Sequence, residues 1–328
     1  MKVLVTGATG FVGSHVADKL IEKKYDVRCI VRKTSNLRWV EGKKLQLIEA
    51  SLSDVSSLEK AVEDVDYVYH VAGSTSARNL DGYMQGNYEG TKNILNATIS
   101  KAPNLKRFLY VSSQTAAGPA IALNKPTTED MPLHPITNYG RSKKAAEEIV
   151  NSNSLNLPIT IVRPPAVYGP RDTEIYTIFK MIKMGFIAYM GFDKKYVSLI
   201  HSEDLSRGII EAAESKKTLG KTYFISSDEF YTWKQVYEEM KKSFGKKNIL
   251  SVRLPHPLIL AAGAISGFFG RFSAKTPVFN YEKGIDFIQK YWICSTESAR
   301  KDFSYSQQIS LEEGISNTIA WYKNNKWL

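Results

Sequence analysis

Cysteine is scarce in this sequence, because Cys29 and Cys294 are the only two among 328 residues. Two cysteines cannot build a disulfide framework, and Cys29 falls in a predicted buried strand, so we expect a reducing, cytoplasmic compartment. The first strand pattern starts at the N-terminus, which leaves no room for a signal peptide. Internal repeats and low-complexity linkers are also absent.

Long hydrophobic runs are lacking as well. The most apolar segment, residues 258–269, is shorter than the roughly 20 residues that span a bilayer, and Arg253, His256 and Arg271 bracket it. We predict a buried or lid helix in a substrate-binding region there. The alternative is an apolar wall for a substrate, or a surface that touches a membrane.

Dense basic tracts are missing, although the net charge is +11. The lysines are scattered in pairs along the chain, which argues against a nucleic-acid partner. We interpret the charge as a solvated surface plus an anionic cofactor, and we expect no metal. The hydrophobic fraction of 43% and the charged fraction of 23% are those of a globular protein. A chain of 328 residues can form one large α/β domain plus a smaller one.

Glycine recurs at every third position near the N-terminus, at Gly7, Gly10 and Gly13. An apolar strand at 3–5 precedes this loop and a helical pattern at 13–24 follows it, an arrangement that binds anions at the helix N-terminus. Gly7 permits the turn, Gly10 lets a pyrophosphate approach, and Gly13 lets helix and strand pack closely. A second strand at 27–31 completes the context of a dinucleotide-binding unit. Thr9, Phe11 and Val12 of the same loop are also predicted to contact the dinucleotide.

Strand and helix patterns alternate through the first half of the chain. Strands are predicted at 3–5, 27–31, 45–49, 67–71, 108–112 and 159–162, with helices at 13–24, 55–62, 88–100 and 140–151. This alternation predicts a Rossmann-type α/β fold, a doubly wound parallel sheet that binds ligands at the carboxyl ends of its strands.

The pattern loosens after Pro170. Helices are predicted at 175–184, 205–213 and 232–243, and strands at 197–200 and 222–225. We expect a dinucleotide-binding domain of residues 1–170 plus about 193–226. A smaller, largely C-terminal substrate-capping region comprises about 171–192 plus 227–328.

Tyr139 and Lys143 stand four residues apart at the start of a predicted helix and therefore share a face. A fixed cation lowers the pKa of a nearby phenol from its ordinary value of about 10. Ser112 and Ser113 end a predicted strand upstream, where a hydroxyl can bond a substrate oxygen. By itself, the Tyr–Lys spacing is weak evidence for a catalytic pair, because two unrelated surface residues can have the same spacing.

Together with Thr6, the glycine loop resembles the TGxxGxxG of the extended short-chain dehydrogenase/reductase superfamily, also called the NAD-dependent epimerase/dehydratase family. Ser113, Tyr139 and Lys143 resemble its catalytic Ser/Thr–Tyr–Lys set. The family's SSxxxxG spacing to Gly118 selects Ser113, which leaves Ser112 as a packing or backbone residue. Stretches 70–73, 83–91, 161–171, 199–204 and 291–322 are similar to further motifs of the family.

The resemblance implies roles for these stretches. Asn87 supports the catalytic centre, and His201 is either a substrate contact or a packing histidine. A helix-paired homodimer is also implied. Cofactor contacts are expected at Val71, Ala72, Gly73, Pro165, Ala166 and Val167, and substrate contacts at Ser74, Thr75, Thr115, Arg171 and His201.

Two departures from the family bear on the cofactor. Ser51, followed by Leu52, occupies the place of an adenine-binding Asp, and Asp54 is predicted to cap a helix instead. Arg32, Lys33 and Ser35 follow the second strand, where an acidic residue would bind the ribose of NAD. They favour NADP(H) over NAD(H), because they form a phosphate clamp; the alternative is solvated charge at a strand end.

Further departures bear on the reaction. Gln114 and Thr115 replace the Asp–Glu pair of sugar-nucleotide dehydratases, and residues 283–292 lack the Arg of sugar-nucleotide epimerases. With its apolar segment, the chain looks more like dihydroflavonol reductases and 3β-hydroxysteroid dehydrogenases. We expect hydride transfer between a nicotinamide and a carbonyl or secondary alcohol of a small, apolar substrate. The alternatives are a nucleotide-sugar epimerase and a non-catalytic NAD(P)-binding sensor.

Overall fold

The computed structural model describes residues 1–270 and 279–328. Its centre is a seven-stranded sheet with the order β11-β6-β5-β4-β1-β2-β3, in which all neighbours are parallel. The strands are β1 (Lys2–Thr6), β2 (Asp26–Val31), β3 (Gln46–Glu49), β4 (Tyr67–His70), β5 (Arg107–Val111), β6 (Ile159–Arg163) and β11 (Lys221–Phe224). From β1 the chain adds β2 and β3 on one side and then β4, β5, β6 and β11 on the other. The direction of winding therefore reverses between β1 and β4, and a doubly wound sheet has its ligand crevice at that point. The predicted fold class is confirmed.

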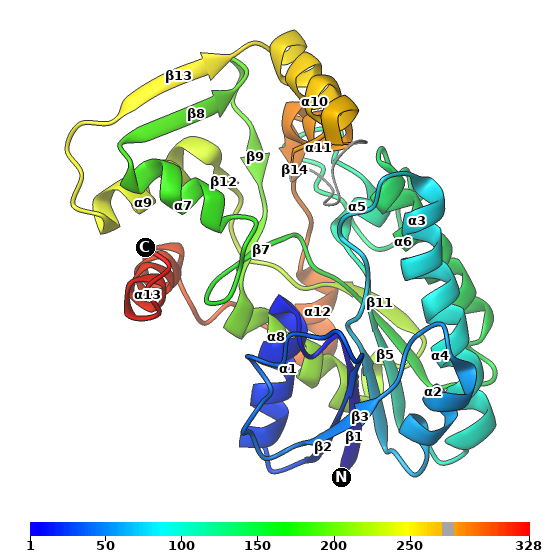
Figure 1. Cartoon of the computed structure of the whole chain (residues 1–328). Helices are drawn as coiled ribbons and strands as arrows, with labels where there is room; N and C mark the ends of the chain where they lie inside the picture. The colour runs from blue at the N-terminus through cyan, green and yellow to red at the C-terminus, as the bar shows by residue number, and fades with distance from the viewer. Residues whose placement is uncertain (271–278) are drawn as a thin grey trace.

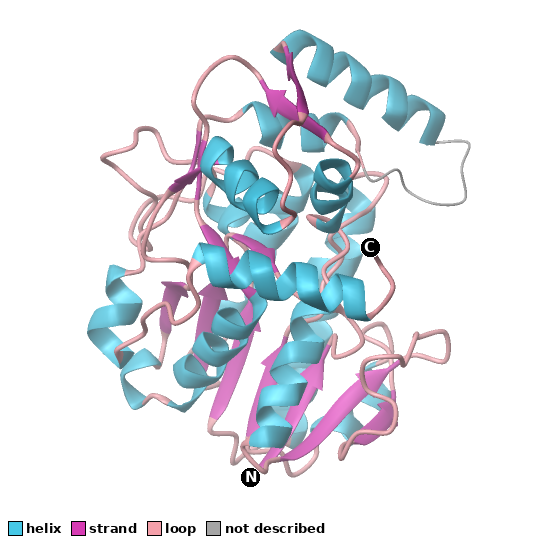
Figure 2. Ribbon diagram, turned by 90° about the vertical axis from the view of Figure 1, so that its left-hand side faces the viewer, coloured by secondary structure: helices cyan, strands magenta, loops and turns pink. Residues whose placement is uncertain are grey.

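Helices cover both faces of this sheet (Figure 2). Alternate residues of a strand point to opposite faces, so Val3 and Val5 pack in one core and Leu4 in the other. Cys29 of β2 is buried in the first core, and both cysteines are free. The first face carries α1 (Phe11–Glu22), α8 (Ser202–Glu214) and α12 (Glu297–Phe303); the second carries α2 (Val55–Val62), α4 (Gly90–Lys101) and α6 (Asn138–Ser152).

The predicted helix 88–100 is part of a longer helical stretch. It runs from α3 (Leu80–Met84) through the π-helical turn η1 (Gln85–Glu89) into α4. A π-turn widens the helix locally and is frequent at functional sites. Here it carries Asn87, which is buried.

The remaining elements lie mostly beyond the carboxyl ends of the central strands (Figure 1). They enclose a separate apolar core. The predicted strand 197–200 is divided into two strands that join different sheets, of orders β12-β9-β14 and β10-β7; a third small sheet pairs β13 with β8. The elements are α5 (Gln114–Ala117), β7 (Ala166–Tyr168), α7 (Tyr176–Lys183), β8 (Phe186–Met190), β9 (Tyr196–Val197), β10 (Leu199–His201), η2 (Lys216–Thr218), β12 (Tyr231–Thr232), α9 (Trp233–Ser243), β13 (Leu250–Leu254), α10 (His256–Gly270), α11 (Tyr281–Ile288), β14 (Tyr291–Trp292) and α13 (Leu311–Asn324).

The apolar segment 258–269 lies within α10, but the expectation of a buried helix is wrong. Only Ile259, Gly263 and Gly270 of this helix are buried, whereas Phe269 at its end is 66% exposed. The helix packs on α11 with one face, and Leu258, Ile265 and Phe269 on its other face are exposed. Within the described residues, no helix is long and apolar enough to cross a membrane.

A buried ion pair ties α6 to the sheet. The Arg163 guanidinium on β6 donates to both carboxylate oxygens of Glu147 on α6, with Nη2–Oε2 at 2.6 Å, and the side chains are only 5% and 1% exposed. Since α6 begins with Asn138 and Tyr139, this contact holds the helix that carries the predicted catalytic tyrosine.

Removing one partner of this pair leaves an uncompensated buried charge. Glu147→Gln is expected to lower the free energy of unfolding by about 3–5 kcal/mol, measured by urea denaturation. The matched control is Glu148→Gln, one residue along, whose partner Lys144 is exposed and whose loss changes stability by about 0.5 kcal/mol or less. Equal effects of the two substitutions would contradict this account.

Candidate active site

The glycine loop brings three elements into direct contact. Gly7 has a positive φ of +75°, and a Cβ there would lie 2.8 Å from the backbone of Ala72. A Cβ on Gly13 would lie 2.2 Å from the Gly7 carbonyl oxygen. Only glycine therefore lets the turn, the start of α1 and the loop after β4 meet.

The N-terminus of α1 fits an anionic ligand. Gly10 is its N-cap, so no side chain caps the helix, and the first turn holds no acidic residue. The first N–H groups of a helix lack intrahelical partners, and those of Phe11, Val12 and Gly13 stand in that position. They suit a dinucleotide pyrophosphate.

His70 fixes the loop that faces this turn. Its Nδ1 lies 2.7 Å from Thr6 Oγ1 and its Nε2 lies 2.9 Å from Thr91 Oγ1. The Ala72 N–H donates to Thr6 Oγ1 at 3.1 Å. Burial lowers the pKa of His70 to about 3, so the ring is neutral and serves as a structural link beneath the cofactor loop 71–73.

Asn87 links that loop to the catalytic helix. Its Oδ1 accepts from the Ser74 N–H at 2.7 Å, and its Nδ2 donates to the Ser74 carbonyl and to Ser142 Oγ. Ser142 in turn donates to the Tyr139 carbonyl at 2.7 Å. A Cβ on Gly73 would lie 2.9 Å from Asn87 Oδ1 and 3.5 Å from Lys143 Nζ. The structure thus makes Asn87 a positioning residue.

Lys143, whose ammonium lies close to Gly73, is buried. Its ammonium donates to the Val111 carbonyl at 2.8 Å and lies 4.5 Å from the centre of the Tyr110 ring. Burial lowers the pKa of Lys143 to about 7, although the Glu147 carboxylate acts in the opposite direction.

Tyr139 shares a hydrogen bond with Ser113, which lowers the pKa of the phenol. Burial has the larger, opposite effect, the Glu174 carboxylate adds to it, and the pKa is raised overall. Tyr139 therefore stands protonated, in the form that can donate a proton.

Of the two candidate serines, Ser113 belongs to the site. Its Oγ accepts from the backbone N–H and the hydroxyl of Thr115, at 3.2 and 2.9 Å. Ser112 is buried, and its backbone N–H donates to Val162 at the end of β6. The neighbouring Gln114 N–H donates to the Pro164 carbonyl, which brings the Ser113 loop beside the segment that contains Pro165, Ala166 and Val167.

The predicted phosphate clamp lies at the end of β2. The Ser35 hydroxyl accepts from the Arg32 N–H at 2.9 Å, and the exposed Lys33 ammonium is 3.6 Å from Glu49. Arg32 is exposed, and its guanidinium makes no ion pair within the described residues.

The segment after β3 lies beside α2 and α4. Ser51 Oγ lies 2.9 Å from Ser53 Oγ, and Leu52 packs against Gly90. Asp54 accepts from the N–H groups of Ser56 and Ser57, which confirms its role as the N-cap of α2.

Arg171 and His201, predicted substrate contacts, have other partners. The Arg171 guanidinium donates to Asp18 at 2.7 Å and stacks over Trp39, away from Tyr139. His201 caps α8 by accepting from the Glu203 N–H at 3.3 Å, and its ring lies edge-on to Tyr168. For His201 the structure supports the packing role.

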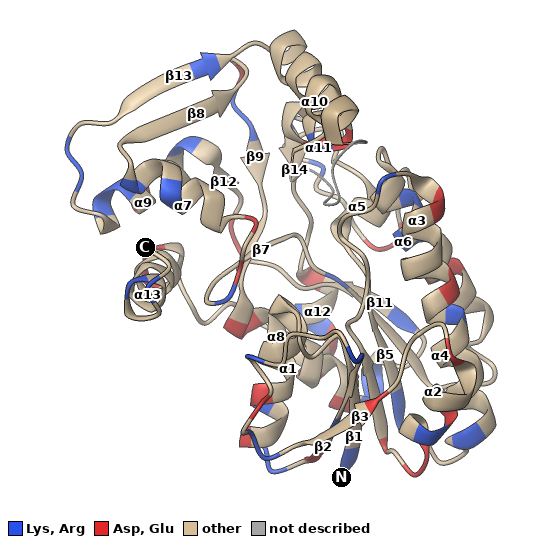
Figure 3. Cartoon of the chain, in the orientation of Figure 1, with Lys and Arg blue, Asp and Glu red and all other residues tan. Residues whose placement is uncertain are grey.

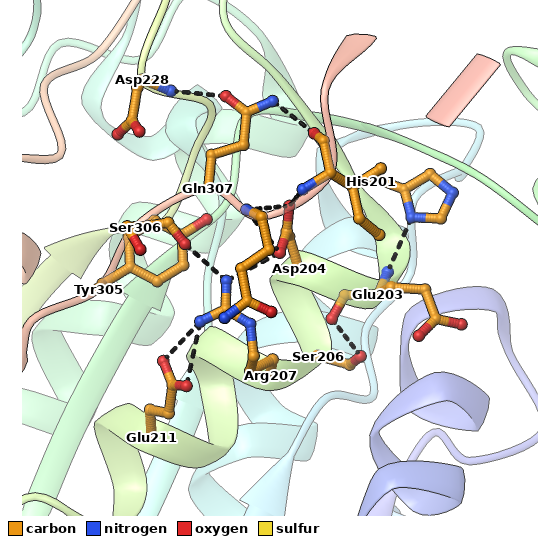
Figure 4. Close-up of polar contacts among 12 residues, drawn as sticks. His201, Glu203, Asp204, Ser206, Arg207, Glu211, Asp228, Tyr305, Ser306 and Gln307 are labelled. Carbon is orange, nitrogen blue, oxygen red and sulfur yellow. Dashed lines mark hydrogen bonds and ion pairs between the residues drawn. The ribbon is translucent and has the colours of Figure 1, made fainter. Parts of the chain in front are cut away.

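Figure 4 shows that the stretch after His201 is an anchoring motif. Asp204 accepts from Arg207 and from the backbone N–H groups of Gln308 and Ile309. Arg207 also donates to the Ser306 carbonyl at 2.6 Å. These bonds hold the segment that leads into α13 against α8, so the matching residues 199–204 stabilise the fold.

The sequence patterns did not mark the charged side chains that α11 brings to the start of α6. Lys283 on α11 pairs with Glu174 at 3.0 Å, and Glu282 accepts from the Asn138 N–H at 2.6 Å. Burial raises the pKa of Asp286 to about 7, and its Oδ1 has no hydrogen-bond partner in the described part of the chain. No local motif marks these residues, since α11 lies far downstream of α6.

Tyr83 also lies beside Tyr139, with 5.9 Å between the ring centres. Tyr83 is the first residue of the stretch 83–91, which resembles a motif of the family, so the sequence did contain a signal for this tyrosine. Thr75, next to Ser74, is exposed.

Across residues 1–270 and 279–328, no group of three His, Cys, Asp or Glu side chains is arranged to hold a metal ion.

A doubly wound sheet, an uncapped glycine-rich helix start and the predicted set of Ser113, Tyr139 and Lys143 are the features expected of an NAD(P)-dependent oxidoreductase of the extended short-chain type. A model of the NAD dependent epimerase/dehydratase family matches residues 3–226, and the chain belongs to this family. It is therefore an enzyme that uses a nicotinamide dinucleotide.

Three known proteins illustrate its relatives. The chain is 28% identical over 329 residues to the ceramide reductase of Caulobacter vibrioides, covering 99% of this chain and 96% of that protein. It is 23% identical to a decarboxylating sterol-4-alpha-carboxylate 3-dehydrogenase of Dictyostelium discoideum, covering 95% and 98%. The UDP-glucuronic acid 4-epimerase of Bacillus cereus, solved with UDP-glucuronic acid and NAD, shares the fold with a TM-score of 0.79, 23% identity and coverage of 99% and 100%.

The glycine loop can be tested by separating binding from folding. A Cβ at position 10 would approach only the Gly7 carbonyl oxygen, at 3.3 Å. Gly10→Ala should therefore fold normally but place a methyl group where the backbone must stay open, weakening NAD(P)H binding about tenfold or more, or by about 1.4 kcal/mol. Nucleotide fluorescence titration and thermal melting provide the two measurements.

Gly13→Ala is the companion variant, because its Cβ would collide with backbone at 2.2 Å. It is expected to lower the melting temperature as well as binding. Unchanged cofactor affinity in Gly10→Ala would contradict the assignment of the loop.

Proposed function

We propose that this enzyme interconverts a ketone and a secondary alcohol on an apolar substrate, with Tyr139 as the proton donor and acceptor. The observation that carries the proposal is the Tyr139 phenol hydrogen-bonded to Ser113, with the buried Lys143 four residues along the same helix. When bound, the nicotinamide supplies or accepts the hydride. The protein supplies the proton and the orientation.

Each residue then has a distinct role. Tyr139 donates a proton to the carbonyl oxygen during reduction and removes it during oxidation. Ser113, held by two hydrogen bonds from Thr115, orients that oxygen and stabilises its developing charge. Lys143 holds the nicotinamide ribose and, when charged, favours the phenolate. Asn87 keeps the helix start in register with the loop 71–74.

An apolar substrate is supported by two observations. The relatives in Caulobacter and Dictyostelium are named for ceramide and a sterol carboxylate, both rich in hydrocarbon. In this chain, α11 brings Phe287 to stack on Phe279 with 6.0 Å between ring centres. The alternative, epimerisation of a nucleotide sugar, is supported by the fold shared with sugar-nucleotide enzymes, but residues 283–292 hold no Arg to meet a sugar pyrophosphate.

Replacing the phenol tests the reaction directly. Tyr139→Phe should lower turnover about 100-fold or more, as loss of a general acid does, while the Kd for NAD(P)H stays within about twofold. The assay monitors NAD(P)H absorbance against long-chain 3-ketones and polycyclic ketones. Tyr25→Phe, whose hydroxyl contacts Glu214 far from the site, is the control.

Three other outcomes would redirect the assignment. Wild-type turnover in Tyr139→Phe would remove the tyrosine from the reaction. Epimerisation of UDP-sugars by protein that copurifies with NAD would establish the alternative. Tight cofactor binding without turnover on either panel would favour a binding protein that senses the NAD(P) state.

For the cofactor we propose NADP(H). Arg32 and Lys33 lie exposed after β2 with the Ser35 hydroxyl beside them, a donor set that suits a 2′-phosphate. No acidic residue stands at positions 32–35 to bind the ribose hydroxyls of NAD.

Arg32→Ala is therefore expected to weaken NADPH binding about tenfold or more and to leave NADH binding within about twofold. Paired fluorescence titrations measure both, and NADH serves as the internal control. Preference of the wild type for NADH, with NADPH affinity unaffected by the substitution, would assign NAD instead.

A further inference from the structure

The outward face of α10 carries no polar side chain. Leu258, Ile265, Phe268 and Phe269 are 59%, 58%, 54% and 66% exposed, and Ala261 and Ala262 between them are exposed too. Their positions recur every three or four residues, so they form one stripe along the helix. We call this stripe, residues 258, 261, 262, 265, 268 and 269, the apolar face of α10.

The inward face of α10 is already satisfied by protein. A Cβ on Gly263 would lie 2.7 Å from the Asn280 carbonyl oxygen, and Ser266 Oγ donates to the Phe279 carbonyl at 2.8 Å. Ile259 is buried. A helix at a water-facing surface places polar residues outward. The reversed arrangement here marks a contact surface.

The surroundings of this face are basic. Residues 244–270 contain three basic residues, Lys246, Lys247 and Arg253, and no Asp or Glu. All three are exposed. Arg253 lies on β13, which leads into α10, whereas Lys246 and Lys247 precede the other end of that strand. Figure 3 shows blue on β13 and on the segment before it. Leu250 on the same edge strand is 67% exposed.

The acidic side chain that contacts the start of α10 is already paired. Asp193 lies 3.4 Å from both Lys195 and His256. Glu282 on α11 accepts from the Asn138 N–H at the start of α6, and Glu174, two residues before α7, pairs with Lys283 on α11. Among the described residues, Lys246, Lys247 and Arg253 make no ion pair, although Arg253 donates to the Phe192 carbonyl at 3.3 Å and lies over the Tyr189 ring. The apolar face of α10 therefore continues an edge whose positive charges are not neutralised by carboxylates.

We propose that the apolar face of α10 docks onto an anionic lipid bilayer. The combination of exposed Leu, Ile and Phe with neighbouring Lys and Arg is that of an interfacial anchor. At about 1.5 Å per residue, the helix is about 22 Å long, shorter than the roughly 30 Å of bilayer hydrocarbon. It lies in the interface and does not span.

A second copy of the chain fits this surface less well. A symmetric contact would place the same patch of both copies together, and so would bring two acid-free basic segments face to face.

Docking there would place the bilayer one helix away from the catalytic site. A Cβ on Gly284 of α11 would lie 3.5 Å from the Ile259 carbonyl on α10, while Glu282 and Lys283 of α11 contact the elements around Tyr139. A lipid-dissolved substrate would then enter from the membrane side. The docking itself does not depend on the proposed reaction.

Vesicle co-sedimentation of the full chain tests this proposal. We expect binding to phosphatidylcholine vesicles that contain about one third phosphatidylglycerol, and weaker binding as salt screens the charges. The double variant Ile265→Ser/Phe269→Ser should lose binding about tenfold or more, with an unchanged melting temperature because both side chains are exposed. Arg253→Glu should weaken binding to anionic vesicles only.

The matched control is Leu155→Ser, since Leu155 is 97% exposed on the loop after α6 and should not affect sedimentation. Absence of vesicle binding, or equal binding by the double variant, would overturn the proposal. So would a concentration-dependent dimer in light scattering that the double variant abolishes, because the second copy would then be the occupant. None of these outcomes alters the Tyr139→Phe test, which is carried out in detergent-dispersed substrate.

Discussion

The carboxamide of Asn87 is the contact on which the catalytic site depends. One side chain satisfies the Ser74 backbone and donates to Ser142, which bonds the Tyr139 carbonyl. The loop that faces the cofactor and the helix that carries the phenol are thereby joined through a buried amide, where a lost partner would be costly. The π-turn at Gln85–Glu89 aims this amide inward, so an irregularity in the helix is part of the construction of the site.

Burial determines the charge of the groups around that contact. The pKa values of His70 and Lys143 fall to about 3 and about 7, and the pKa of Tyr139 rises. The cause is the same in each case, because removal from water disfavours the charged form. The Glu147 carboxylate, itself paired with Arg163, is the group that favours the charged lysine.

The predicted catalytic residues and the elements proposed to contact the substrate lie in different parts of the molecule. The sheet and its loops carry the cofactor seat and the catalytic trio, whereas the elements beyond the strand ends supply α11, its charged side chains and the exposed α10 (Figure 1). A fold of this kind does not by itself define a substrate. The elements beyond the strand ends are the part of the chain in which the sequence patterns were weakest.

Local patterns in the sequence determined most of the framework. The glycine spacing, the strand pattern and the Tyr139–Lys143 interval each describe geometry within a few residues, and such geometry follows from backbone sterics and periodicity. The role of Asp54 as the N-cap of α2 is another such local feature, because the cap bonds only to residues two and three positions along the chain. Only the tertiary structure decided which distant groups meet: Arg171 pairs with Asp18, Lys283 pairs with Glu174, and the carboxyls of Glu174 and Asp286 raise the pKa of Tyr139. It also left α10 uncovered, because exposure depends on how separate segments pack and no local pattern records that packing.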